Sequence, residues 1–133
     1  MTLLDIAKSF FIGKVAKNGV AVDFTMGNGH DTLWLSNAVG ENGKVYAFDI
    51  QPQALESSKR LLTESGASPN YTLILDSHSN VLDYVNEKIC IGMFNLGFLH
   101  GGDKSITTKR DTTMIAIRAA IDLLDADGAL LIA

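Results

Sequence analysis

Residues 23–32 read DFTMGNGHDT, in which an acidic residue precedes two glycines that flank one asparagine. The run begins inside VAVDF (20–24), a short apolar and β-branched stretch that predicts a strand. Residues 31–39, DTLWLSNAV, predict a helix that ends at Gly40. A glycine-rich turn between a strand and a helix can bring the backbone close to a small ligand. The stretch therefore predicts an α/β fold with a ligand site at this turn.

The rest of the chain alternates between predicted helices and strands. The strands are apolar throughout rather than alternating, which is typical of strands that are buried on both faces. With intervening helices, this pattern predicts an α/β three-layer sandwich around a mostly parallel, Rossmann-like sheet. The further predicted elements are a helix over 3–17, a strand over 44–50, a helix from Pro52 to Glu64, strands over 71–75 and 88–94, a helix over 109–124 with Met114, Ile117, Ile121 and Leu124 on one side, and a strand over 128–133.

Length and composition describe one ordinary domain over residues 1–133. Asp and Glu outnumber Lys and Arg by 15 to 11, so no global positive field attracts nucleic acid, and a polyanionic partner needs a local basic patch. A single cysteine, Cys90, lies in an apolar run and fits a reducing cytoplasm. No export signal, membrane span or metal site is predicted.

Polar or small residues follow four of the predicted strands. Right-handed crossovers place the carboxyl ends of parallel strands at one edge of the sheet, where ligands bind. Each segment alone has an ordinary explanation, such as a tight turn or a helix cap. All four at one edge favour a common ligand site, made of DFTMGNGHD (23–31), DIQ (49–51), DSHS (76–79) and NLGFLHGGDKS (95–105).

One missing glycine and two carboxylates restrict which class of ligand the turn can bind. Thr32 stands where the G-x-G-x-x-G pattern of dinucleotide-binding turns has its third glycine. Asp23 would repel a pyrophosphate but suits a cationic ammonium, and Asp49, 20 positions beyond Gly29, suits a ribose diol. A ribose and an ammonium without phosphate describe S-adenosylmethionine. An NAD(P)-dependent oxidoreductase is the alternative, weakened by the missing glycine.

With these residues, the chain resembles class I S-adenosylmethionine-dependent methyltransferases, and more narrowly the small bacterial family labelled rRNA methylase. The resemblance rests on DFTMGNGHDT, YAFDIQ, LDSHSN and FNLGFLHGGDKSITT, which together run from the first strand to the helix before the fifth. It implies action on RNA, with tRNA rather than rRNA as substrate. The implied reaction is methylation of the aminomethyl group on a modified wobble uridine in the anticodon loop.

The same resemblance implies a cofactor site that follows the first three strands. The glycine turn would hold the methionine moiety, the second strand would hold the ribose, and the third would hold the adenine. The residues implied are Asp23, Gly27, Asn28, Gly29 and His30 around the methionine moiety, Asp49 and Gln51 at the ribose and adenine, and Asp76, Ser77 and His78 around the adenine.

Catalytic and substrate-binding residues are expected after the fourth strand. Asn95 could accept an N–H bond from the amine and aim its lone pair at the methyl group, and Asp103 could then take the proton. A turn residue before Gly97 is the other explanation for Asn95. The expected substrate-binding residues are His100, where the family often has proline, Gly101, Gly102, and the basic residues Lys104, Lys109 and Arg110, which an exposed helix start would also explain.

The chain ends on its fifth predicted strand, whereas the class I sheet usually has seven. We therefore expect either a chain truncated after strand 5 or cover from another subunit. A bare apolar edge strand tends to pair with a neighbour, so a homodimer is predicted. The same feature keeps a catalytically inactive S-adenosylmethionine-binding module open as a third hypothesis.

Overall fold

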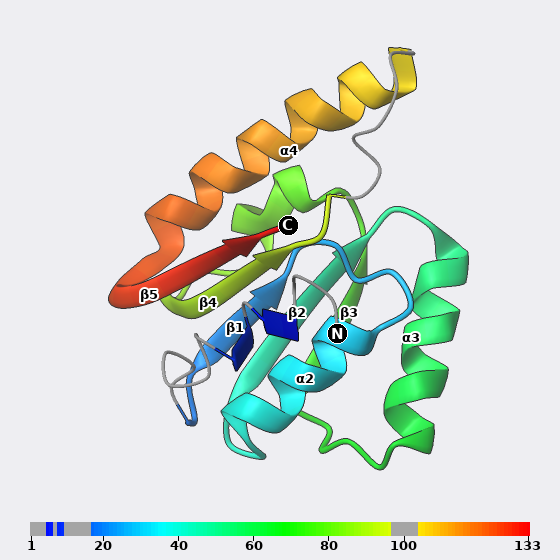
Figure 1. Cartoon of the computed structure of the whole chain (residues 1–133), viewed down its shortest axis with the longest axis vertical. Coiled ribbons are helices and arrows are strands. Elements are labelled where there is room, and N and C mark those ends of the chain that lie inside the picture. The colour runs from blue at the N-terminus through cyan, green and yellow to red at the C-terminus, as the bar shows by residue number, and fades with distance from the viewer. Residues whose placement is uncertain (1–4, 7, 10–16, 97–103) are drawn as a thin grey trace.

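Five parallel strands form one sheet in the computed structural model, which describes residues 5–6, 8–9, 17–96 and 104–133, the side chains of 104–109 excepted (Figure 1). The strand order is β3-β2-β1-β4-β5, so the order reverses between β1 and β4. All neighbouring pairs are parallel. The strands are β1 (Val20–Asp23), β2 (Lys44–Asp49), β3 (Tyr71–Leu75), β4 (Ile89–Phe94) and β5 (Leu124–Ile132).

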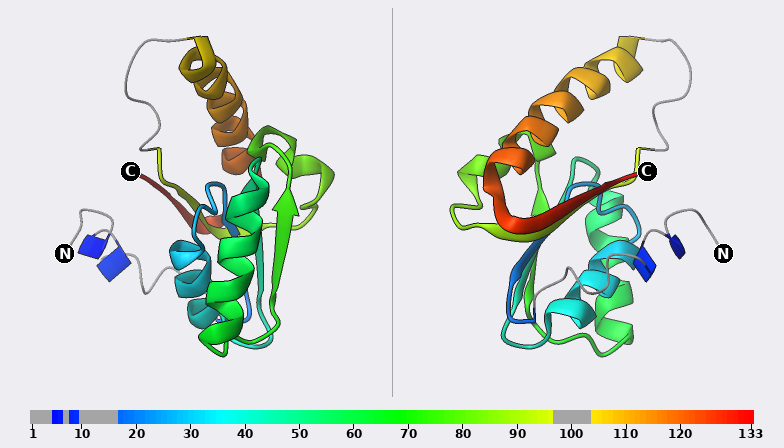
Figure 2. Two further views of the ribbon diagram at one scale, coloured as in Figure 1. Left: turned by 90° about the vertical axis from the view of Figure 1, so that its right-hand side faces the viewer. Right: turned by 60° about the vertical axis from the view of Figure 1, so that its left-hand side comes forward.

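Helices cover both faces of the sheet (Figure 2). One face carries α2 (His30–Val39) and α3 (Pro52–Glu64), and the other carries the 3-10 helix η2 (His78–Asp83) and α4 (Lys104–Leu123). The predicted three-layer α/β fold is therefore confirmed, with α3 and β3 at their predicted limits. Within the predicted helix over 3–17, residues 5, 6, 8 and 9 are helical and residue 17 is in a turn. The other residues of this range lie outside the described residues.

The core consists of two layers because successive residues of β1 point to opposite faces. Ala21 packs with α2 residues such as Leu35 on one face, and Val22 packs with α4 residues such as Ala116 on the other, all with no exposed surface. Strands that bury both faces need apolar residues at consecutive positions. This requirement explains the continuous apolar runs in the sequence.

The predicted apolar side of the last helix is wrong for two of its four residues, since Ile117 and Leu124 pack against the core whereas Met114 and Ile121 are exposed. Met114 and Ile121 are 50% and 57% exposed, whereas Thr113, Ala116 and Ala120 are buried. The buried residues follow the helical spacing one position away from the large apolar ones. Small side chains let α4 lie close to η2 and the sheet, and this close approach decides which face is buried. The helix also begins at Lys104 rather than at 109.

The last strand begins at Leu124 rather than at 128. Its register against β4 shifts between the pairs Ile89–Leu124 and Ile91–Ala129. A Cβ on Gly128 would lie 2.8 Å from the Leu124 side chain and 3.1 Å from the Ile89 carbonyl oxygen, so glycine permits this irregularity. The strand prediction missed the extension because residues 124–127 include two aspartates.

Within the described part of the chain, no helix is long and apolar enough to cross a membrane. Nor do three or more His, Cys, Asp or Glu side chains there gather in a way that could hold a metal ion. Cys90, in β4, is a half-buried free thiol.

Gly29 is the residue that allows α2 to start directly against α3. It precedes α2 with φ of 92°, in the left-handed region that glycine favours. A Cβ at this position would lie 2.8 Å from Ser58 Cα and 2.9 Å from Ser58 Oγ. In dinucleotide-binding turns the third glycine allows the helix to pack closely on a strand. Here the second glycine allows close packing between two helices.

We expect Gly29→Ala to lower the free energy of unfolding by about 2–4 kcal/mol, because left-handed strain and overpacking against Ser58 add together. Gly66→Ala is the matched control, since Gly66 has φ of 68° and an added Cβ there would meet no atom of the described residues within 4 Å. It should cost about 1 kcal/mol from backbone strain alone. Urea unfolding of both variants measures the difference, and equal losses would contradict the packing argument.

Candidate functional site

The carboxyl ends of β1 and β4 lie side by side where the strand order reverses. The Phe24 N–H donates to the Met93 carbonyl at 2.9 Å, and the Asn95 N–H donates to Thr25 Oγ1 at 2.7 Å. In open α/β sheets, this reversal is the point where ligands bind. The polar segments that the sequence singled out therefore surround the position that the topology selects.

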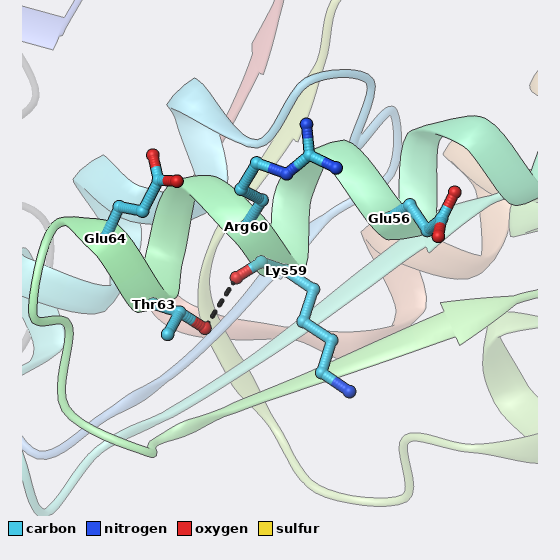
Figure 3. A pocket seen from close by; sticks show the side chains of 5 residues that line it. All are labelled: Glu56, Lys59, Arg60, Thr63 and Glu64. Atoms are coloured by element: carbon cyan, nitrogen blue, oxygen red, sulfur yellow. Dashed lines mark hydrogen bonds between the residues drawn. The ribbon is translucent and has the colours of Figure 1, made fainter.

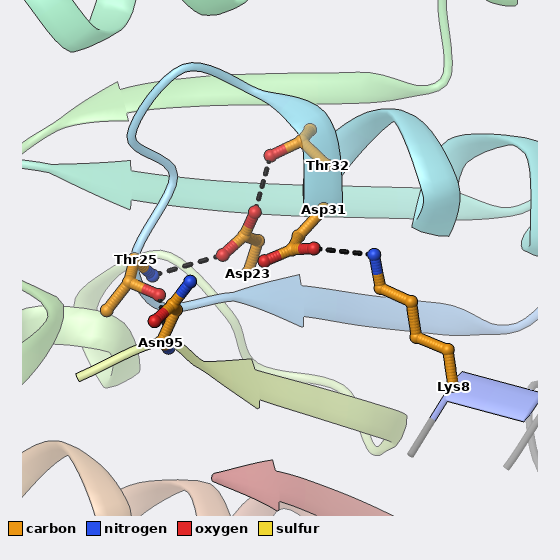
Figure 4. A network of polar contacts seen from close by, with 6 residues as sticks. All are labelled: Lys8, Asp23, Thr25, Asp31, Thr32 and Asn95. Atoms are coloured by element: carbon orange, nitrogen blue, oxygen red, sulfur yellow. Dashed lines mark hydrogen bonds and ion pairs between the residues drawn. The ribbon is translucent and has the colours of Figure 1, made fainter. Parts of the chain in front are cut away.

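Asp23, the last residue of β1, is completely buried at this point (Figure 4). Its Oδ2 accepts a hydrogen bond from Thr32 Oγ1 at 2.7 Å, and its Oδ1 accepts one from the Thr25 N–H at 3.1 Å. Burial raises the pKa of Asp23 to about 7, against the opposing effect of the Thr32 hydrogen bond. Thr32 thus occupies the third-glycine position because it is the partner of a buried carboxyl group.

The start of α2 lies open beside this carboxyl group. His30 is exposed, no side chain among the described residues caps the helix, and Asn28 is exposed in the preceding turn. Asp31 pairs with Lys8 at 2.7 Å. Uncapped N–H groups at a helix N-terminus favour a bound carboxylate. The geometry is compatible with the predicted place of the methionine carboxylate.

Asp49, the last residue of β2, is tied to the glycine turn. Its Oδ2 accepts from the Gly27 N–H at 3.1 Å, and its Oδ1 accepts from the Gln51 N–H at 3.0 Å. Ser58 Oγ on α3 donates to the Gly27 carbonyl at 2.9 Å. These bonds hold the carboxylate, the turn and the exposed Gln51 next to one another.

Asp76, after β3, organises its own loop. Its Oδ2 accepts from the Tyr84 hydroxyl at 2.7 Å, and its Oδ1 accepts from Asn80 Nδ2 at 3.0 Å and the Ser77 N–H at 2.7 Å. The hydrogen bond from Tyr84, followed by those from Asn80 and Ser77, lowers the pKa of Asp76. Ser77 caps η2 through its side chain, which accepts from the Ser79 N–H. Asp76 and Ser77 thus stabilise the loop after β3, and their predicted contact with adenine stays a prediction.

His78 joins three elements beneath the edge of the sheet. Nδ1 lies 2.8 Å from the Phe24 carbonyl oxygen, and Nε2 lies 3.3 Å from Thr113 Oγ1 on α4. Because a carbonyl only accepts, Nδ1 carries the proton and Nε2 can accept from the Thr113 hydroxyl. Burial lowers the pKa of His78. Both nitrogens are thus engaged within the chain, where the sequence had suggested a contact with adenine.

Only some of the residues that we expect to bind the substrate or act in catalysis lie in the described part of the chain. Asn95 is exposed directly after β4, and Arg110 is exposed on α4. Lys104 and Lys109 belong to the first turns of α4, and the structure describes their backbone but not their side chains. His100, Gly101, Gly102 and Asp103 also lie outside the described residues.

Three hydroxyl groups were missed by the sequence reasoning. Thr25 binds the Asn95 N–H, Thr32 binds Asp23, and Ser58 binds the Gly27 carbonyl. Thr32 carried a signal, because it replaces a glycine in a recognisable pattern. Ser58 carried none, since its contact spans 31 positions of the sequence.

Two surface hollows lie away from the strand ends that form the candidate site. One, of about 310 Å³, follows the exposed side of α3 between Glu56 and Glu64 (Figure 3). Another, of about 210 Å³, lies between Lys8 and Trp34. Neither is lined by Asp49, Asp76 or Asn95. The candidate site is therefore defined by its hydrogen-bonding groups rather than by these hollows.

Comparison with known proteins finds similar methyltransferases. The family model described as "Putative rRNA methylase" matches residues 45–133. The chain is 40% identical over 124 residues to tRNA (mnm(5)s(2)U34)-methyltransferase, chloroplastic, from Arabidopsis thaliana, covering 86% of this chain and 45% of that protein. It therefore spans less than half the length of this curated relative.

Two solved structures share the fold over nearly the whole chain. One is a "putative rRNA-methylase" from Clostridium thermocellum, with a TM-score of 0.87 and 38% identity, covering 98% of this chain and 70% of that one. Another is a "putative methyltransferase" from Streptococcus mutans in complex with SAH, with a TM-score of 0.84 and 37% identity, covering 99% of this chain and 72% of that one.

The buried Asp23 should make stability depend on pH. Its folded-state pKa of about 7 lies above the ordinary 3.8, so the folded protein binds this proton more tightly than the unfolded chain. The free energy of unfolding should therefore fall as the pH rises from 4 to 7, by up to about 4 kcal/mol from this group. Asp23→Asn keeps the shape, its Oδ1 can still accept from the Thr25 N–H, and its Nδ2 can donate to Thr32 Oγ1 in reversed direction. It should abolish that fall, as chemical unfolding at each pH would show.

His78 acts in the opposite direction, because its pKa is lowered from 6.5. Stability that depends on neutral His78 is lost as the pH falls below 6.5. In Asp23→Asn, stability should therefore rise as the pH rises toward 6.5. The control is Asp127→Asn on the exposed part of β5, which should follow the wild type. Parallel pH curves for wild type and Asp23→Asn would contradict the expectation.

Proposed function

The chain belongs to the rRNA methylase family, and from this premise we propose that it transfers a methyl group from S-adenosylmethionine to RNA. The observation that carries the proposal is the Asp49 carboxylate, which the Gly27 and Gln51 N–H groups hold at the end of β2. A carboxylate in this place suits the two hydroxyls of a ribose. The SAH in the Streptococcus mutans relative, the demethylated product of this cofactor, supports the choice of ligand.

The residues at the edge of the sheet fit this cofactor. Gly27 has φ of 53°, and the nearest atom to an added Cβ is the Thr25 carbonyl oxygen at 3.9 Å, so a ligand can approach the backbone closely. Asp49 and Gln51 would hold the ribose and adenine. Asn28, His30 and the N–H groups that begin α2 would hold the methionine moiety. When bound, the cofactor supplies an electrophilic methyl group on a sulfonium.

The chain's own residues then have to orient the acceptor. Methyl transfer is an in-line displacement, so alignment and exclusion of water supply most of the catalysis. The Asn95 side chain would accept an N–H bond from an amine and direct its lone pair. Asp103 would take the proton that the amine loses. The acceptor must reach the uncharged state before it reacts.

For the substrate, we propose the aminomethyl group of a modified uridine at the tRNA wobble position. The printed name of the Arabidopsis relative supports this choice. A base in a single-stranded anticodon loop can be unstacked and inserted beside the cofactor. The net charge of -4 favours few phosphate contacts, so Lys104, Lys109 and Arg110 would carry most of them.

A homodimer and a cytoplasmic location stay predictions. Among the described residues β5 has a strand partner on the β4 side alone, and Ile132 on it is 50% exposed. An edge strand of this kind supports association through the end of the sheet. The half-buried free thiol of Cys90 supports a reducing compartment.

Asp49→Ala should weaken binding of S-adenosylmethionine by at least ~2 kcal/mol, the scale for losing a charged hydrogen-bond acceptor. Isothermal titration calorimetry measures the effect. Asp127→Ala is the matched control, because Asp127 is exposed on β5, which the strands β1 and β4 separate from β2. A parallel titration with NAD tests the oxidoreductase alternative, which is favoured if NAD alone binds.

Cells that lack the gene should accumulate wobble uridines in the unmethylated aminomethyl form. Mass spectrometry of tRNA nucleosides measures this change. Wild type and Asp127→Ala should restore the methylated nucleoside on complementation, whereas Asp49→Ala should not, because its cofactor site is impaired. A normal nucleoside profile in the deletion strain would falsify the wobble-uridine proposal and shift attention to another acceptor.

A further inference from the structure

A continuous set of hydrogen bonds runs from α2 to the end of β4 (Figure 4). Thr32 Oγ1 donates to Asp23 Oδ2 at 2.7 Å, and the Thr25 N–H donates to Asp23 Oδ1 at 3.1 Å. Thr25 Oγ1 in turn accepts from the Asn95 N–H at 2.7 Å. The turn between β1 and α2 is thus joined to the end of β4, 70 positions further along the chain, where the strand order reverses.

Thr25 is the member of this set that reaches Asn95. It follows β1 after Phe24, whose N–H still bonds to the Met93 carbonyl at 2.9 Å. Regular backbone pairing between β1 and β4 is therefore followed by a bond in which a threonine hydroxyl replaces a backbone carbonyl. Such a side-chain bond can place the Asn95 backbone at a distance that a regular ladder would not allow.

The residues before and after Asn95 are hydrogen-bonded to Ala133, the residue that follows β5. The Leu96 N–H donates to the Ala133 carbonyl at 2.7 Å, and the Ala133 N–H donates to the Phe94 carbonyl at 2.9 Å. The residues on both sides of Asn95 are therefore paired with Ala133, which follows β5, and Asn95 itself is paired with Thr25. Exposed though its side chain is, its backbone is bonded to the β1 side of the sheet.

We propose that Thr25 is a positioning residue for the transfer step, which sets the location of Asn95 through the bond from the Asn95 N–H to its hydroxyl. The inference rests on the proposed function, in which Asn95 orients the acceptor amine. Asp23 and Thr32 support Thr25 from behind, because the buried carboxyl group fixes the Thr25 backbone. Small displacements matter here, since misplacement by about 1 Å can slow a reaction about a hundredfold.

Thr25→Val and Thr25→Ser separate the hydroxyl from the shape of the side chain. Valine keeps the branched shape and removes the acceptor, whereas serine keeps the acceptor. Thr63→Val is the matched control, because it makes the same change at an exposed site on α3, where the hydroxyl bonds to the Lys59 carbonyl at 2.7 Å (Figure 3). All variants are made in the full chain.

Two measurements are taken on each variant. Amide hydrogen exchange should be about three- to tenfold faster at Asn95 in Thr25→Val, the scale of one hydrogen bond, and unchanged in Thr25→Ser and Thr63→Val. For methyl transfer to tRNA, kcat should fall about ten- to hundredfold in Thr25→Val, with KM and the Kd for S-adenosylmethionine within about twofold. Thr25→Ser should recover most of the rate.

The outcomes are distinct for the two proposals. Unchanged exchange at Asn95 or an unchanged kcat in Thr25→Val overturns the positioning role. So does a loss of rate that Thr25→Ser shares fully, because the hydroxyl would then not be the cause. A wild-type protein that binds S-adenosylmethionine but transfers no methyl group to any RNA overturns the proposed function, even where Asn95 exchange responds to Thr25→Val.

Discussion

The buried carboxyl group of Asp23 is the constraint on which the edge of the sheet depends. A carboxylate without water is costly unless hydrogen bonds replace the lost solvation. Here the two oxygens are satisfied by the Thr32 hydroxyl and the Thr25 N–H. The same two bonds fix the start of α2 and the first residues after β1. The glycine turn between them is therefore held at both ends by one side chain.

A second group of contacts, from α3 and the end of β2, also fixes the glycine turn. Gly29 lets α2 start against Ser58, and the Ser58 hydroxyl bonds to the Gly27 carbonyl. The Gly27 N–H donates to Asp49. Burial of Asp23 and packing of Gly29 thus decide where the Asp49 carboxylate lies. A cofactor that uses Asp49 would benefit from a turn that is already ordered before binding. The chain belongs to the rRNA methylase family, and it shares its fold with a solved structure over nearly its whole length.

What the sequence determined by itself was local or periodic. Apolar runs and turn residues predicted the parallel three-layer fold, and α3 and β3 matched their predicted limits. The residues after each strand could be grouped in advance because parallel strands end at a common edge. Asp49 and Gly27 were selected in this way, and the structure places them 3.1 Å apart at their polar atoms.

Only the tertiary structure decided which partners the polar groups chose and which face of α4 was buried. Met114 and Ile121 are more hydrophobic than Ala116 and Ala120, yet the alanines are buried because α4 packs closely against η2. His78 bonds to Phe24, 54 positions away, and to Thr113, 35 positions away. Pairings of this kind depend on the distance between elements after folding, and no local pattern in the chain records that distance.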